Sequence, residues 1–167
     1  MEADLRERES AQRPTASAAG CREGANRHGR AYAVMYDLSG LGAGRMREVM
    51  DDWTALRTQM GIADDPAYLR HRGKPLVAVW GIGFNDGRKY TVGECRELVE
   101  FLKKDGCSVM LGVPTGWRAL DRDSVRDPEL HEVIKLADVV SPWTAGRYRT
   151  PAEAARHGEK MLAPDLA

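Results

Sequence analysis

The sequence predicts an α/β fold in which parallel strands alternate with helices, and two observations lead to it. Short apolar runs begin near residues 31, 76, 108 and 139, and each is followed by an amphipathic segment or a helix-start motif. Glycine and small polar residues separate the strands from the helices, as they do in turns. Alternation of this kind pairs the strands in parallel through right-handed crossovers, so each strand–helix unit adds one strand to the same sheet.

The first unit begins with the apolar run AYAVMYD, residues 31–37, and continues through the glycine-rich LSGLGAG. Residues 45–60 place apolar side chains three and four positions apart, which predicts a long amphipathic helix. Trp53 lies on that apolar stripe, so it is expected in the core. The basic turn RHRGK, residues 70–74, is expected to be a solvated charged loop.

The second unit contains LVAVWGIGF, residues 76–84, a nearly continuous apolar run typical of strands covered on both faces. Asn85-Asp86-Gly87 supplies turn chemistry after it. Thr91 and Glu94 form a capping box that predicts a helix start, and Gly106 is expected to end that helix.

The third strand is predicted at CSVMLGV, residues 107–113, and Asp127 followed by a proline predicts the next helix start. The fourth strand is predicted at DVVSPW, residues 138–143. Thr150 followed by a proline and then Glu153 predicts the last helix by the same rule.

These units are close in spacing to those of a (β/α)8 barrel, but a whole barrel needs about 250 residues. The chain has 167 residues and four units, so we expect a partial TIM (β/α)8 barrel whose sheet edge nothing in the sequence covers. Residues 1–22 have no apolar periodicity and are expected to be a disordered tail. Residues 23–167 are then the folded domain.

The composition argues against several classes of partner. Lys plus Arg is 25 and Asp plus Glu is 25, so no excess of positive charge indicates nucleic acid or acidic lipid. No apolar run approaches the roughly 20 residues that span a bilayer. The three cysteines and four histidines lack the spacing of metal ligands, and no cofactor is expected. The N-terminus has no apolar region of a secretory signal, and the compartment stays open.

Candidate binding residues gather where the predicted strands end, since parallel α/β proteins build their sites at the carboxyl ends of strands. Tryptophan faces stack on the C–H groups of sugars, and short polar side chains bind the hydroxyls, so the pattern favours a glycan. Trp80 and Trp143 could instead cap the core, and Asp37 could accept a backbone N–H. The candidate residues are Asp37, Trp80, Asn85, Trp117, Trp143 and Tyr148.

Three segments, AYAVMYDLSGL, KPLVAVWGIGFNDGR and VVSPWTAGRY, together resemble bacterial carbohydrate-active proteins grouped as glycoside hydrolase family 71/99-like, some of them named xylosidase or arabinosidase. The similarity runs from about residue 20 to the C-terminus. It implies a (β/α)8 barrel, glycan substrates, and a cleft faced by Asp37, Trp80, Asn85 and Trp143. The carboxylates that catalyse hydrolysis in the family lie on later strands, so no catalytic residue is assigned.

The resemblance therefore predicts an internal fragment of a glycosidase, inactive without its remaining strands. The alternative is a non-catalytic half barrel that binds glycan and associates with a copy of itself through the exposed sheet edge. A third possibility is a small doubly wound sheet that binds a nucleotide at SGLGAG, although the phosphate-binding GxGxxG pattern is incomplete there.

Overall fold

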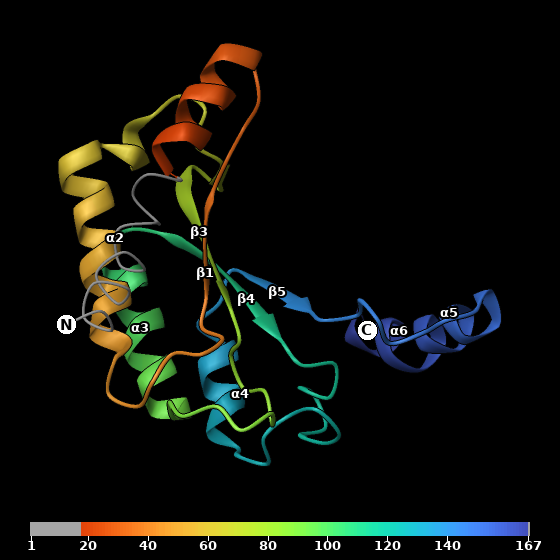
Figure 1. Ribbon diagram of the computed structural model, residues 1–167. Helices are drawn as coiled ribbons and strands as arrows, with labels where there is room; N and C mark the ends of the chain where they lie inside the picture. The colour runs from red at the N-terminus through yellow and green to blue at the C-terminus, as the bar shows by residue number, and fades with distance from the viewer. Residues whose placement is uncertain (1–17, 167) are drawn as a thin grey trace, which may run out of the picture.

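The computed structural model describes residues 18–166, which form a mainly parallel β-sheet with helices packed against it (Figure 1). The main helices are α2 (Met46–Met60) and α3 (Val92–Lys104). Within this part of the chain, no helix is long and apolar enough to cross a membrane. The strands are β1 (Val34–Asp37), β2 (Arg70–His71), β3 (Lys74–Trp80), β4 (Ser108–Val113) and β5 (Val139–Pro142), and the shorter helices are η1 (Ile62–Asp64), α4 (Glu129–Ile134), α5 (Pro151–His157), η2 (Gly158–Leu162) and α6 (Ala163–Asp165).

Four strands lie in the order β1-β3-β4-β5, and each neighbouring pair is parallel. The predicted α/β fold with parallel pairing is confirmed, since these four strands are the four apolar runs. β1 begins at Val34 and not near residue 31. The reason is that the backbone of Tyr32 pairs with the segment before β2, donating to the Ala67 carbonyl at 3.1 Å and accepting from the Leu69 N–H at 2.8 Å.

The helices α2, α3 and α4 pack on one face of the sheet, and the core lies between these helices and the sheet. Successive side chains of a strand point to opposite faces, and on β3 Val77 and Val79 are the fully buried ones of this core. Trp53 of α2 is 0% exposed, as predicted, and its indole N–H donates to the Asp105 carboxylate at 2.7 Å. The only polar atom of this side chain is therefore satisfied inside the core.

The predicted helix starts are also present. Thr91 Oγ1 accepts from the Glu94 N–H at 3.1 Å and Glu94 Oε2 accepts from the Thr91 N–H at 2.8 Å, which completes the capping box of α3. The Asp127 carboxylate accepts from the Glu129 N–H at 2.9 Å where α4 begins. Thr150 Oγ1 caps α5 in the same way. Local capping chemistry thus fixes where the crossovers enter their helices.

The opposite face of the sheet carries Met35, the Leu76–Ala78–Trp80 side of β3, Met110 and Val139, none of which belongs to the core under the helices. We call this set the open face. Met35 is 64% exposed and Met110 and Val139 are half-buried, whereas Leu76 and Ala78 are buried. Parallel sheets are normally covered by helices on both faces, so it is unusual that apolar side chains on this face have no helix over them.

A helix over residues 18–28 lies at the amino end of the strands. Its Arg22 guanidinium pairs with the buried Asp65 carboxylate at 2.6 Å, and Asn26 Nδ2 donates to the same group at 3.0 Å. The hydrogen bond from Asn26, with those from the backbone N–H of Ala67 and from Arg22, holds the pKa of Asp65 below its usual value. The prediction of a disordered tail is therefore wrong for residues 18–22, and its earlier part lies outside the described residues.

The RHRGK segment was predicted as a loop, and this is wrong in part, because it forms the β2–β3 hairpin. Arg72 and Gly73 both have positive φ, 50° and 80°, the conformation of the tight turn that suits a two-residue hairpin. His71 Nδ1 lies 2.8 Å from the Ser108 hydroxyl. Backbone pairing and this contact tie the basic segment to the start of β4.

Candidate binding site at the carboxyl ends of the strands

An aromatic cluster lies at the carboxyl end of β3 and β5. The ring centroids of Trp80 and Trp143 are 4.3 Å apart, and those of Trp80 and Phe84 are 4.8 Å apart. We call Trp80, Phe84 and Trp143 the aromatic platform. Trp143 is 43% exposed, whereas Phe84 is buried and packs against the indole of Trp80. Phe84 was not among the predicted residues, although it ends the same apolar run as Trp80.

Gly112 of β4 gives the Trp80 indole its place. A Cβ atom on Gly112 would lie 2.2 Å from Trp80 Cε3, so only glycine leaves room for the ring on the open face. Trp80 and Gly112 are paired in the β3–β4 register. Regular strand geometry therefore sets the place of Trp80, whereas Phe84 and Trp143 lie in the segments that follow β3 and β5.

Asp37 is the β1 partner of Trp80 and is exposed. Its Oδ1 accepts from the Ser39 N–H at 2.9 Å, which is the backbone role considered as an alternative from the sequence. The strand register still places this carboxylate one strand away from Trp80, on the same face of the sheet. Asp37 thus stabilises its own turn and also lies beside the aromatic platform.

Asp86 and Arg88 form a second polar group at the carboxyl end of the sheet, which we call the rim. The Arg88 guanidinium contacts both Asp86 oxygens at 2.8–3.1 Å and the Tyr90 hydroxyl at 3.0 Å, while its Cζ lies 5.2 Å from the centre of the Phe84 ring. Burial raises the pKa of Tyr90 to about 12, so its hydroxyl stays protonated and donates to the Gly81 carbonyl at 2.8 Å. Asp86 is therefore committed to Arg88 and serves more than the turn.

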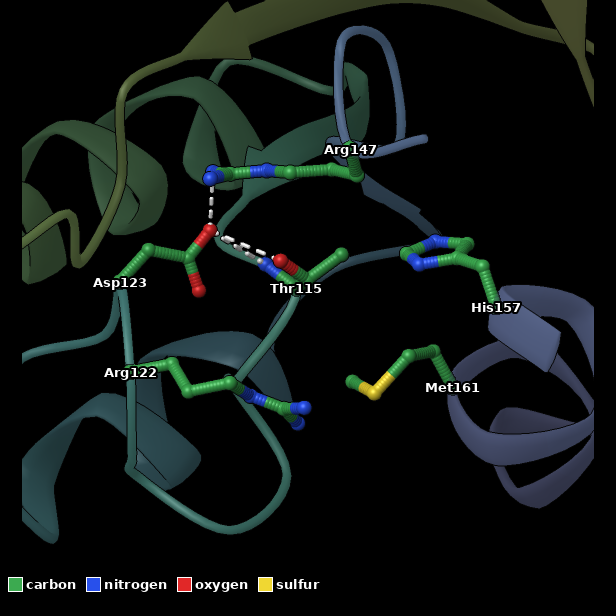
Figure 2. A pocket seen from close by; sticks show the side chains of 6 residues that line it. All are labelled: Thr115, Arg122, Asp123, Arg147, His157 and Met161. Carbon is green, nitrogen blue, oxygen red and sulfur yellow. Dashed lines mark hydrogen bonds and ion pairs between the residues drawn. The ribbon is translucent and has the colours of Figure 1, made fainter. Parts of the chain in front are cut away.

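The third polar group surrounds Asp123, which sequence reasoning missed. Figure 2 shows its carboxylate facing Thr115, whose N–H and hydroxyl donate to it at 3.1 and 2.8 Å, and paired with Arg147. The Gly116 N–H donates at 2.9 Å. Burial alone would raise the pKa of Asp123, but these donors outweigh it and hold that pKa below its usual value. The adjoining cavity of about 410 Å³ is lined by Thr115, Arg122, Asp123, Arg147, His157 and Met161.

The loop after β4 is strained. Leu120 and Arg122 have positive φ values of 53° and 52°, a backbone conformation that residues other than glycine rarely adopt. A Cβ atom on Gly116 would lie 2.1 Å from the Asp121 carbonyl oxygen. Strained backbone of this kind gathers at functional sites, because the surrounding structure must stabilise it. This strained loop carries Thr115 and Asp123, the residues of the third polar group.

The six predicted residues do not all lie together. Trp80 and Trp143 are in contact and Asp37 is one strand away, whereas Asn85 is exposed and its backbone N–H donates to the Asp123 carbonyl at 2.8 Å. The other two predicted residues lie apart from the platform. Trp117 packs partly buried against the core beside α4, with its carbonyl 2.9 Å from His131 Nε2, and Tyr148 is 42% exposed with its ring 5.6 Å from that of His157.

The SGLGAG segment does not offer a free anion site. The Glu94 carboxylate accepts from the Gly44 N–H at 2.8 Å, directly before α2 begins. A phosphate group at this position would meet the negative charge of Glu94. The strand order also runs in chain order, without the reversal at which doubly wound sheets bind nucleotides.

Residues 18–166 contain no group of three or more His, Cys, Asp or Glu side chains that could hold a metal ion. No protein-family model matches the sequence, and neither a curated protein nor a solved structure is significantly similar to it. The arrangement at the rim can bind a ligand with an apolar face and hydroxyl groups, because the aromatic platform lies among exposed carboxylates and loop polar groups.

Proposed function

We propose that this domain is a partial (β/α)8 barrel that binds glycans on the aromatic platform. The strand order equals the chain order, and α2, α3 and α4 all lie on one face, as in consecutive units of such a barrel. The resemblance to the glycoside hydrolase family 71/99-like proteins points to the same fold and the same class of ligand.

The observation that carries the proposal is the pair of tryptophans, Trp80 and Trp143, that contact each other at the carboxyl end of the sheet with their ring planes tilted by 54°. The Trp143 side chain contacts Trp80 and is 43% exposed, so part of its indole is open to a ligand. A sugar ring laid on this indole buries apolar C–H surface and leaves its hydroxyls directed at the rim. The exposed carboxylate of Asp37 lies beside Trp80 in the strand register.

Binding is better supported than hydrolysis in this chain. Glycoside hydrolysis needs two carboxyl groups, and the general acid among them needs a raised pKa. Asp86 is paired with Arg88, and Asp123 has a lowered pKa and a full set of donors. Among the acidic groups described here, this leaves Asp37 as the one carboxylate that faces the platform without a cationic partner.

Intrinsic fluorescence tests the proposal, because Trp80 and Trp143 would change their emission when a sugar covers them. We expect a saturable change with xylo-, arabino- or manno-oligosaccharides and no release of reducing ends. Trp143→Ala should weaken binding about tenfold, which corresponds to about 1.4 kcal/mol of stacking. Trp117→Phe is the matched control, since Trp117 packs against the core, and it should bind as the native chain does. Equal binding by the Trp143→Ala variant, or steady release of reducing ends, contradicts the proposal.

A further inference from the structure

The sheet leaves two problems unsolved in a single chain. Its open face carries apolar side chains beside the polar Asp37, Ser108 and Ser141, with Met35 at 64% exposure. Its outer strands β1 and β5 each have a partner on one side only within the described residues. Unpaired backbone N–H and C=O groups on an edge strand bind another strand readily. Both the open face and the two edges are therefore free to bind further parallel strands.

A second copy of this chain supplies both missing edges. All four strands run in the same direction, so rotation by 180° about an axis along that direction keeps every strand parallel. The rotation brings β5 of each copy beside β1 of the other at two equivalent junctions. Eight parallel strands result, which is the number that closes a barrel filled by its own side chains.

We propose that the chain forms a two-fold homodimer through β1 and β5, with the two open faces enclosed as the interior of an eight-stranded barrel. The inference rests on the partial-barrel part of the proposed function. It also completes the glycan site, because Trp143 directly follows β5 and would lie at the same end of the barrel as the partner subunit's Asp37, which ends β1. Each binding surface then takes its aromatic face from one copy and a carboxylate from the other.

Two further features agree with a second copy as the occupant. The chain carries 25 basic and 25 acidic residues, so two copies meet without net repulsion. A groove of about 390 Å³ runs along the β1 edge between that strand and α2, lined by Val34, Tyr36, Asp52 and Leu56 among others. In a barrel this is the place where the helix of the neighbouring unit packs against the first strand.

One residue limits the pairing. Pro142 has no N–H, and at the end of β5 it removes one donor from that strand. The junction must therefore use the part of β5 before Pro142. Proline at this position also prevents the pairing from extending past the strand, which favours a closed dimer over an open ladder of copies.

Sedimentation analysis of the whole chain at micromolar concentrations tests the proposal. The expected species has twice the chain mass of 18.5 kDa. Met35→Lys should shift it to the monomer, because a lysine that is solvated in the monomer would be enclosed in the barrel. Met35→Leu keeps the apolar side chain and should remain dimeric. Ser141→Lys, an exposed change on β5, tests the other side of the junction, and circular dichroism confirms that each variant folds.

Amide hydrogen exchange gives the second measurement. In the dimer the N–H groups of Met35 and Asp37 gain partners and should exchange at least tenfold more slowly than in the Ser141→Lys monomer, which leaves β1 unchanged. A native chain that stays monomeric, an association that neither lysine variant weakens, or open-ended polymers would each overturn the proposal. Glycan binding distinguishes the dimer proposal from the proposed function. If a monomeric variant binds glycan as the native dimer does, the site shared between two copies is refuted and binding on the aromatic platform is not. If the native chain is a dimer that binds no glycan, only the proposed function is refuted.

Discussion

Replacing Gly112 by alanine tests whether the Trp80 indole is held where the strand geometry places it. The added Cβ would lie 2.2 Å from Cε3 and 2.9 Å from Cζ3 of Trp80, whereas ordinary contacts begin at 3.4 Å. The ring must therefore move by about 1.2 Å, and it cannot do so freely, because Trp143 and Phe84 pack against it at 4.3 and 4.8 Å. Overpacking of this kind costs about 1–3 kcal/mol.

The assay is urea unfolding of Gly112→Ala and the native chain at one fixed protein concentration, followed by tryptophan emission and by circular dichroism. We expect a lower midpoint and a shifted emission of the folded state. Gly24→Ala is the control, since Gly24 lies inside the helix over residues 18–28 with no atom within 4 Å of the added Cβ. That change should stabilise the chain by about 0.5–1 kcal/mol. An unchanged midpoint and emission for Gly112→Ala would show that the ring does not occupy this place, and the aromatic platform would then be wrong.

Three other predictions concern Asp123, the capping box at Thr91 and the three cysteines. The folded state lowers the pKa of Asp123, so the stability that this carboxylate contributes is present above the ordinary aspartate pKa and is lost as the pH falls through the lowered pKa. Asp123→Asn should therefore flatten the acid limb of a plot of unfolding free energy against pH. An unchanged acid limb contradicts this prediction. Thr91→Ala should cost about 1 kcal/mol in urea unfolding and Thr91→Ser much less, so equal losses would argue against the capping box. A thiol reagent at pH 8 should label the exposed Cys21 quickly and should label Cys95 and Cys107 only on unfolding. Burial protects these two thiols and raises their pKa values to about 12 and 11. Three fast reactions would contradict the buried core.

The sheet and its main helices could be predicted because their signals are local. The stripe that buries Trp53 and the capping box at Thr91 depend on residues at most a few positions apart, and both are present in the structure. The helix over residues 18–28 could not be found in this way. It is held by polar contacts with Asp65, 43 positions from Arg22, and such contacts leave no apolar period in the sequence.

The site was predictable only where strand ends determine it. Asp37, Trp80 and Trp143 follow from the rule that parallel strands present their carboxyl ends together. Asp123 could not be found, since its place depends on the loop after β4 folding back on the loop after β3, through the hydrogen bonds from Asn85 N–H to its carbonyl and from Val125 N–H to Gly83. Those contacts join segments that no local pattern relates.

The agreement between strand order and chain order has a consequence for how the sheet is made during synthesis. Partner positions in successive parallel strands are 43, 32 and 29 residues apart, and no strand has to insert between two that are already paired. Each new unit can therefore dock on the one before it as the chain leaves the ribosome. Among the described strands β5 pairs last, so Trp143, which directly follows β5, comes into place after the rest of this sheet.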